Sequence, residues 1–408
     1  MKLDRLAFTI LSVVGLFLGS VSAAVCCPFC SAPSLTKSEE VAQSDAVVLV
    51  QWVEGKKTKG QEPGNTTYEI VQVVKGPGAS LKKGKRITLV RYRTAKKGDL
   101  FLLMGTQTAG IEWGSPLEVT ETSFNYIAQA PSPEDSTQKR LAYYLKFLEF
   151  PDQLVSNDAY AEFANAPYKD ITSLADVMPR NKIRKWITNP DTPATRLGLY
   201  GLFLGLCGEP EDADLMKKKI TEPTDDFRLG IDGVMFGYLL LTGKEGLDLV
   251  DRLKLKSPYV LDENGKPVLD KDGKKKPLPF SETYSAMQAL RSMWTYGEGR
   301  IDKERLRQSM RILLDRPELA DLVIANLSRW EDWSVQDKLM DLYGAKEYNI
   351  PSIKRAIIRY MLVSSKDAQV AENIKPPAHV IKGRKHMAAL RKQDPKTVRE
   401  AERFFFLK

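Results

Sequence analysis

Histidine is nearly absent from this sequence. Of the 408 residues only two are histidines, His379 and His386, and both lie near the C-terminus. A catalytic triad that depends on histidine is therefore not expected. No glycine-rich loop follows a strand-like segment and opens a helix, as a nucleotide site requires. We therefore predict a non-enzymatic protein with no catalytic residues, no cofactor and no metal site.

Long apolar runs are also absent, except at the N-terminus. Residues 6–21 (LAFTILSVVGLFLGSV) are apolar, with the cations Lys2 and Arg5 before them and small residues after them. This order is typical of a secretory signal peptide, here residues 1–24, with cleavage after Ala23 or Ala24. The alternative is an uncleaved membrane anchor, although the run is shorter than the ~20 residues that a bilayer span needs. We expect a secreted or periplasmic protein with no stable membrane span after cleavage.

Neither sign of charge dominates the chain. The net charge is +9, from 61 basic and 52 acidic residues that are largely interspersed. Because an exported protein rarely meets nucleic acid, we expect no nucleic-acid partner and instead a protein or envelope partner. The one concentrated basic segment is residues 375–408, predicted as a basic C-terminal tail. It is interpreted as a solvated terminal helix, with a partner-binding arm as the alternative.

Three of the four cysteines, Cys26, Cys27 and Cys30, lie together just after the predicted signal. Cys27 and Cys30 have the CxxC spacing, which suits a disulfide, a redox-active dithiol or two positions on a metal. In an oxidising compartment we favour a structural disulfide. A thiol-disulfide oxidoreductase that uses Cys27 and Cys30 stays open as an alternative. Cys207 lies on an apolar helix face and is predicted to be a buried thiol.

Residues 25–130 have the pattern of a small β-domain. Short β-branched, apolar segments are bounded by Gly, Lys and Pro clusters, and no long helix separates them. The predicted strands are residues 46–53, 66–74, 86–92 and 99–104, with weaker ones near 117–120 and 124–129. A short helix is expected over residues 36–42. This spacing favours a small antiparallel barrel or sandwich.

From residue 131 onward the apolar residues recur at helical spacing. Residues 131–190 are predicted as a helical linker region and residues 191–374 as helical repeats. Three long apolar helices end in glycine, and each is followed by a second amphipathic helix; the segments are 196–208 with 213–220, 230–243 with 246–255, and 285–297 with 303–314. Such units indicate a helical solenoid. A polar insert at 258–280, with two Asx-rich turns, is predicted as an exposed hairpin or loop.

The N-terminal region resembles a netrin-like module, the OB-type barrel of tissue inhibitors of metalloproteinases. The resemblance rests on the cysteines that begin the mature chain, on VAQSDAVV (41–48), on YEIVQVVKGP (68–77) and on GDLFLL (98–103). In that family the N-terminal cysteine chelates the zinc of the target protease, and by similarity Cys26 is that residue. The second half resembles HEAT-type repeats in pattern.

Together these features predict the fold class, a small OB-like antiparallel β-barrel followed by an all-α helical repeat (solenoid-like) domain. They favour an exported binding or scaffold protein of the cell envelope or extracellular space. The alternative is a metalloprotease inhibitor that acts through its cysteine-led N-terminus.

Overall fold

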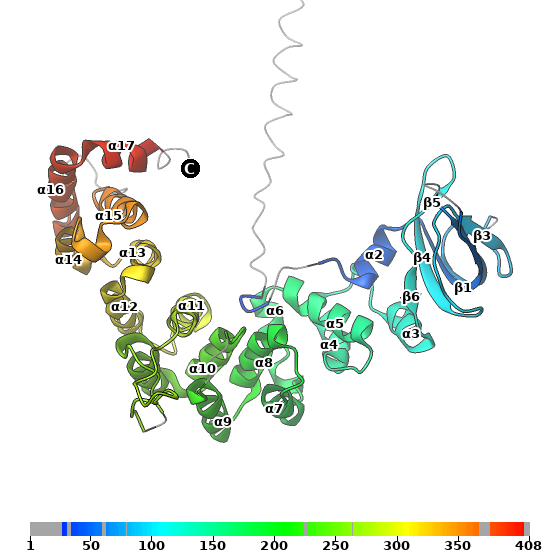
Figure 1. The fold of residues 1–408 in the computed structure, drawn as a ribbon, viewed down its shortest axis with the longest axis horizontal. Helices are drawn as coiled ribbons and strands as arrows, with labels where there is room; N and C mark the ends of the chain where they lie inside the picture. Colours follow the sequence, from blue (N-terminus) through cyan, green and yellow to red (C-terminus); the bar gives the residue numbers. More distant parts are fainter. Residues whose placement is uncertain are drawn as a thin grey trace, which may run out of the picture. The chain divides into compact units, whose positions relative to one another are not determined.

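The computed structural model describes residues 27–30, 34–58, 63–78, 80–223, 227–262, 264–366 and 376–403. The predicted signal at 1–24 and Cys26 lie outside the described residues, so cleavage and export stay predictions. The chain divides into two compact units, one ending at Leu174 and the other beginning at Ala175. Figure 1 draws both units, and each is described by itself.

The first unit contains a six-stranded antiparallel sheet. Its strands are β1 (Ala46–Lys56), β2 (Asn65–Lys75), β3 (Arg86–Leu89), β4 (Leu100–Gln107), β5 (Ile111–Trp113) and β6 (Leu117–Val119). The strand order is β3-β2-β1-β4-β5, and β6 also pairs with β4. The β1–β2 register shifts at three places, and such irregularities bend a strand and increase its twist. The sheet curls into a nearly closed barrel, which confirms the predicted class of this region (Figure 1).

The barrel core follows from alternation along the strands. Val48 and Val50 of β1 pack with Tyr68 of β2 and with Phe101 and Leu103 of β4 in one buried cluster. Because successive side chains of a strand point to opposite faces, the residues between them face the other way. Val47, Leu49 and Leu102 are nevertheless buried too, so the central strands are covered on both faces.

The described part of the first unit also contains helices. The helices are α2 (Lys37–Gln43), α3 (Glu121–Gln129), α4 (Thr137–Tyr144), the 3-10 turn η2 (Leu145–Phe147), α5 (Gln153–Asn165) and α6 (Tyr168–Thr172). The short helix expected at 36–42 is confirmed as α2. The weak strand predicted at 124–129 is wrong, because this segment belongs to α3. Thr120 and Ser123 form a reciprocal capping box that starts a helix there, and Phe124 and Ile127 are buried at helical spacing.

The second unit is built of helices that pack mainly on their neighbours in the sequence. They are η3 (Ala175–Val177), α7 (Arg180–Thr188), α8 (Ala194–Cys207), α9 (Pro210–Thr221), α10 (Ile231–Val250), the π-helix η4 (Asp251–Lys256), α11 (Phe280–Tyr296), α12 (Lys303–Ile312), η5 (Leu313–Asp315), η6 (Pro317–Leu319), α13 (Ala320–Arg329), η7 (Trp333–Val335), α14 (Gln336–Leu342), η8 (Lys346–Tyr348), α15 (Pro351–Ser364), α16 (Ala378–Gln393) and α17 (Pro395–Arg403). Contacts run from α7 to α8, α8 to α10, α10 to α11, α11 to α12, α12 to α13, α13 to α15 and α15 to α16. This succession confirms the predicted helical domain.

Glycines allow α8 and α10, which are both largely apolar, to pack closely against each other. A Cβ atom added to Gly237 would lie 2.0 Å from the carbonyl oxygen of Gly201, and one added to Gly205 would lie 2.4 Å from the Cα of Gly237. The two backbones are therefore in direct contact, which only glycine permits at these positions. Both helices are buried by this close packing and by their other neighbours.

Two segments predicted to be peripheral have defined structures. The described part of the tail, residues 376–403, forms α16 and α17, and both helices contact α15. Their apolar residues Val380, Met387, Leu390 and Val398 are buried. The tail is therefore packed on one side and basic on the other.

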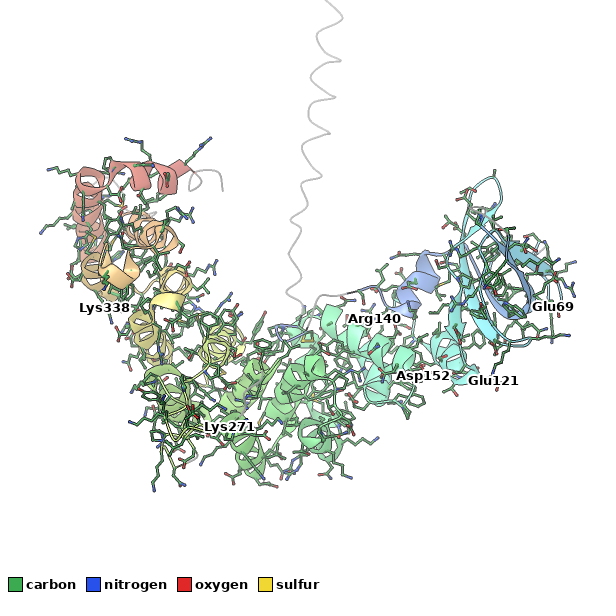
Figure 2. All side chains as sticks on the ribbon, in the orientation of Figure 1. Glu69, Glu121, Arg140, Asp152, Lys271 and Lys338 are labelled. Atoms are coloured by element: carbon green, nitrogen blue, oxygen red, sulfur yellow. A yellow bond between two sulfur atoms is a disulfide. The ribbon has the colours of Figure 1, made fainter. Side chains whose placement is uncertain are left out.

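The insert at 258–280 is largely exposed, as predicted. Isolated bridges join Tyr259 to Pro277 and Leu269 to Lys275. The two Asx turns form, because Asp262 and Asp270 each accept two backbone hydrogen bonds through Oδ1. Lys271 lies in the second turn (Figure 2).

Candidate functional site

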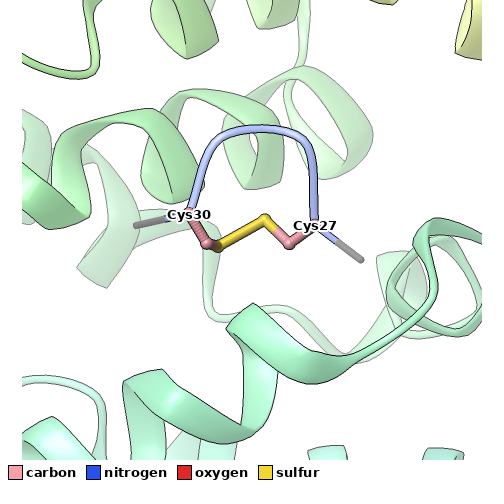
Figure 3. The surroundings of a disulfide bond; sticks show 2 residues. All are labelled: Cys27 and Cys30. Carbon is pink, nitrogen blue, oxygen red and sulfur yellow. A yellow bond between two sulfur atoms is a disulfide. The ribbon is translucent and has the colours of Figure 1, made fainter. Parts of the chain in front are cut away.

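The CxxC segment is oxidised. Cys27 and Cys30 form a disulfide across a short turn, with their Cα atoms 5.6 Å apart (Figure 3). Cys27 is buried, whereas Cys30 is half-buried. The predicted disulfide is therefore present. Contact of Cys26 with the zinc of a partner stays a prediction, because Cys26 lies outside the described residues.

Cys207 is a free thiol at the end of α8. It is half-buried rather than fully buried. Burial, with a smaller contribution from Asp212, raises the pKa of this thiol to about 11. It is therefore protonated near neutral pH and is a poor nucleophile.

A buried polar network joins the helices of the first unit. The carboxylate of Asp158 in α5 accepts a hydrogen bond from the hydroxyl of Tyr126 at 2.8 Å and from the backbone N–H of Lys37 at 2.7 Å. The hydroxyls of Tyr144 and Ser38 lie 3.0 Å apart. Burial raises the pKa of Asp158, and the hydrogen bonds to its carboxylate oppose that rise. The network links α2 to α3, α4 and α5, which is a structural role.

Glu162 is the second buried carboxyl of α5. Its Oε1 lies 2.9 Å from Nε of Arg140, which is labelled in Figure 2. The two atoms lack the geometry of a hydrogen bond, so their attraction is Coulombic. Burial raises the pKa of Glu162 to about 7, although the charge of Arg140 lowers it. Glu162 therefore titrates near neutral pH.

The second unit has a groove of about 720 Å³ between α13 and α15. On α13 the lining begins at Asp321 and continues with residues 1, 4, 7 and 8 positions after it, which share one helix face. These residues are Leu322, Ala325, Ser328 and Arg329. On α15 it is lined chiefly by Ser352, Arg355, Ala356, Arg359, Tyr360 and Val363. Four of the lining side chains, those of Ala325, Ser328, Ser352 and Ala356, are small, and larger residues there would fill part of this space.

The rim of this groove is basic. Arg329, Arg355, Arg359 and Lys366 line it with a single carboxylate, Asp321. Arg355 lies 3.9 Å from Glu400, but Arg329 and Arg359 have no carboxylate partner among the residues that the structure describes. Both side chains belong to exposed residues.

Other arginines of the same unit differ from these two. Arg305 bonds Asp248 and Asp251 at 2.6 and 2.7 Å. Arg311 contacts Glu304 and makes two hydrogen bonds to Asp332. Arg329 and Arg359 are thus open to an external anion, and the sequence interpretation missed them. In the sequence, the only indication of this groove was that these arginines share a helix face with alanine and serine on two helices. The sequence alone does not show which arginines have carboxylate partners.

Comparison with known proteins adds no assignment. No protein-family model, no curated protein and no solved structure matches the chain. Among the described residues, no helix has both the length and the apolar character that crossing a membrane requires. In the same part of the chain, no three His, Cys, Asp or Glu residues are placed to hold a metal ion.

Proposed function

We propose that this chain is an exported, non-enzymatic binding protein of the cell envelope or extracellular space, and that the α13–α15 groove is its binding surface. The observation that carries the proposal is the pair Arg329 and Arg359, which face the groove without carboxylate partners in the described chain. Unpaired guanidinium groups beside an apolar surface supply both orientation and burial to a bound protein segment.

The shape of the groove supports this function. Leu322, which is 42% exposed, and Val363 give it apolar surface, while Ser328 and Ser352 provide hydroxyl groups. Concave sites that combine apolar lining with a few polar groups are typical of ligand sites. The export part of the proposal rests on the apolar N-terminal segment at residues 6–21.

The test is site-specific photocrosslinking in the native host. A photoreactive residue replaces Ser328 in one variant and Ser352 in another, and a matched control places it at the exposed Ala388 of α16. Both groove positions are expected to crosslink the same protein, which the purified chain then binds directly. Ala356→Trp, which fills the groove, is expected to remove this product. Equal crosslinking from Ala388, or none from the groove, contradicts the proposal.

A further inference from the structure

We infer that the occupant of the α13–α15 groove is an acidic, amphipathic segment of a protein partner, whose carboxylates pair with Arg329 and Arg359. This inference rests on the proposed function and names the chemistry of the partner. The first argument is the local charge, since Arg329 and Arg359 line the groove without a carboxylate partner in the described chain and Asp321 is the one carboxylate in its lining. An anionic segment gains attraction there that a neutral or cationic one does not.

The second argument concerns the kind of anion. Guanidinium groups bind carboxylates through two parallel hydrogen bonds, so two arginines on facing helices fix two acidic side chains in register. Arg329 and Arg359 come from α13 and α15, which lie on either side of the groove. A partner that uses both must place carboxylates on its two edges.

The third argument favours a peptide over a sulfated glycan. The small and apolar side chains of Ala325, Ala356 and Val363 line the same groove as the arginines. A glycan has little apolar surface to bury there, whereas a leucine or valine of a peptide loses its contact with water. A groove lined by both apolar side chains and arginines therefore fits an amphipathic chain.

The groove also sets the length of the segment. The lining residues of α15 and its C-terminal end run from Ser352 to Lys366. At a rise of 1.5 Å per residue this span is about 21 Å, which corresponds to roughly 14 residues of a helix or 6 of an extended strand. A single short segment is enough to fill the groove.

The experiment uses the full mature chain and a fluorescein-labelled 14-residue peptide. The peptide has leucines on one face and glutamates on both edges, and a matched peptide has glutamine in place of every glutamate. Fluorescence anisotropy measures binding of both. We expect the glutamate peptide to bind about tenfold more tightly than the glutamine peptide at low salt, with the difference decreasing as salt is added.

Two double variants locate the interaction. Arg329→Gln with Arg359→Gln is expected to weaken binding of the glutamate peptide about tenfold, because both charge pairs are lost. Lys385→Gln with Lys392→Gln removes the same charge from exposed positions of α16 and is expected to change binding less than about twofold. Circular dichroism checks that each variant is folded.

Several outcomes overturn the inference. These are equal binding of the two peptides, no binding of the glutamate peptide, or equal losses in the two double variants. Heparin is tested separately as a ligand of the wild-type chain and of the Arg329→Gln, Arg359→Gln double variant. If heparin binds through these two arginines and the glutamate peptide does not bind, the ligand is a sulfated polymer and the inference is wrong. If neither peptide binds but the groove crosslinks a protein, the proposed binding function stands and the acidic partner is wrong. If the glutamate peptide binds but the groove crosslinks no protein, the proposed function is wrong and the groove only has an affinity for acidic peptides.

Discussion

Asp158 caps a helix that begins 121 residues before it. Its Oδ1 accepts a 2.7 Å hydrogen bond from the backbone N–H of Lys37, the first residue of α2. The first N–H groups of a helix have no partner within the helix, so a carboxylate placed there stabilises it. Oδ2 of the same carboxylate accepts the Tyr126 hydroxyl. Asp158 thus connects α2, just before the barrel, with helices that follow the barrel.

Loss of this carboxylate is expected to loosen α2. Asp158→Ala leaves the Lys37 N–H and the Tyr126 hydroxyl without their partner in a buried site, which costs about 2–4 kcal/mol of unfolding free energy. Hydrogen exchange is expected to accelerate over residues 37–43 more than in the barrel strands. The exposed Glu121→Gln serves as the control. Unchanged exchange in α2 would show that the cap contributes nothing.

Glu162 predicts a pH dependence of stability. Burial raises its pKa from the ordinary 4.5 to about 7 in the folded protein. Between these values the folded state binds more protons than the unfolded state, so the unfolding free energy falls as pH rises and levels off above pH 7. The total is roughly 3 kcal/mol. The raised pKa of Asp158 acts in the same direction.

The measurement for Glu162 is urea unfolding of the full chain at pH 4.5, 6 and 7.5, followed by hydrogen exchange in α4 and α5. Glu162→Gln cannot titrate, so it is expected to flatten the pH profile of these helices. Glu149→Gln changes a half-buried glutamate elsewhere in the first unit and keeps the profile. A slope that survives in Glu162→Gln assigns the pH dependence to another group.

The contact between α8 and α10 predicts a steric effect. Gly237→Ala places a methyl group against the backbone of Gly201, so the helices must separate. Overpacking of this kind costs about 1–3 kcal/mol, and more where backbone opposes backbone. Thermal unfolding of the second unit is expected at a lower Tm. Gly78→Ala, with nothing within 4 Å of the added carbon, is the control for an open site and is expected to leave the Tm nearly unchanged.

The cysteines predict a defined mass and labelling pattern. The mature protein is expected to lack residues 1–23 or 1–24, and Cys27 and Cys30 are expected to resist alkylation until a reductant is added. Cys207 is expected to react without reductant once the chain is unfolded, because it is free. Intact-mass and peptide analysis measure all of these. An intact N-terminus contradicts the cleavable signal.

The same preparation tests the oxidoreductase alternative. Failure of the purified protein to reduce or oxidise any dithiol substrate excludes it. The disulfide closes a loop of four residues, so its removal in Cys27→Ser with Cys30→Ser is expected to cost only about 2 kcal/mol. A much larger loss would show that the disulfide holds more than this local turn.

Local sequence patterns predicted most of the fold. Short β-branched, apolar segments bounded by Gly, Lys and Pro clusters indicated β1, β2 and β4. Helical spacing and terminal glycines indicated α8 and α11. The segment at 124–129 was misassigned because its aromatic and β-branched residues favour strands, while the capping box at Thr120 and Ser123 favoured a helix.

The sequence by itself determined most of the strands and helices, because residue type, periodicity and capping act between residues close in the chain. Only the tertiary structure decided which charges are paired. Nothing in the sequence distinguishes Arg311, bound to Asp332, from Arg329 and Arg359, which have no carboxylate partner among the described residues. Pairing depends on which helix faces meet, and the meeting of α13 and α15 leaves a groove lined by arginines rather than a closed ion pair.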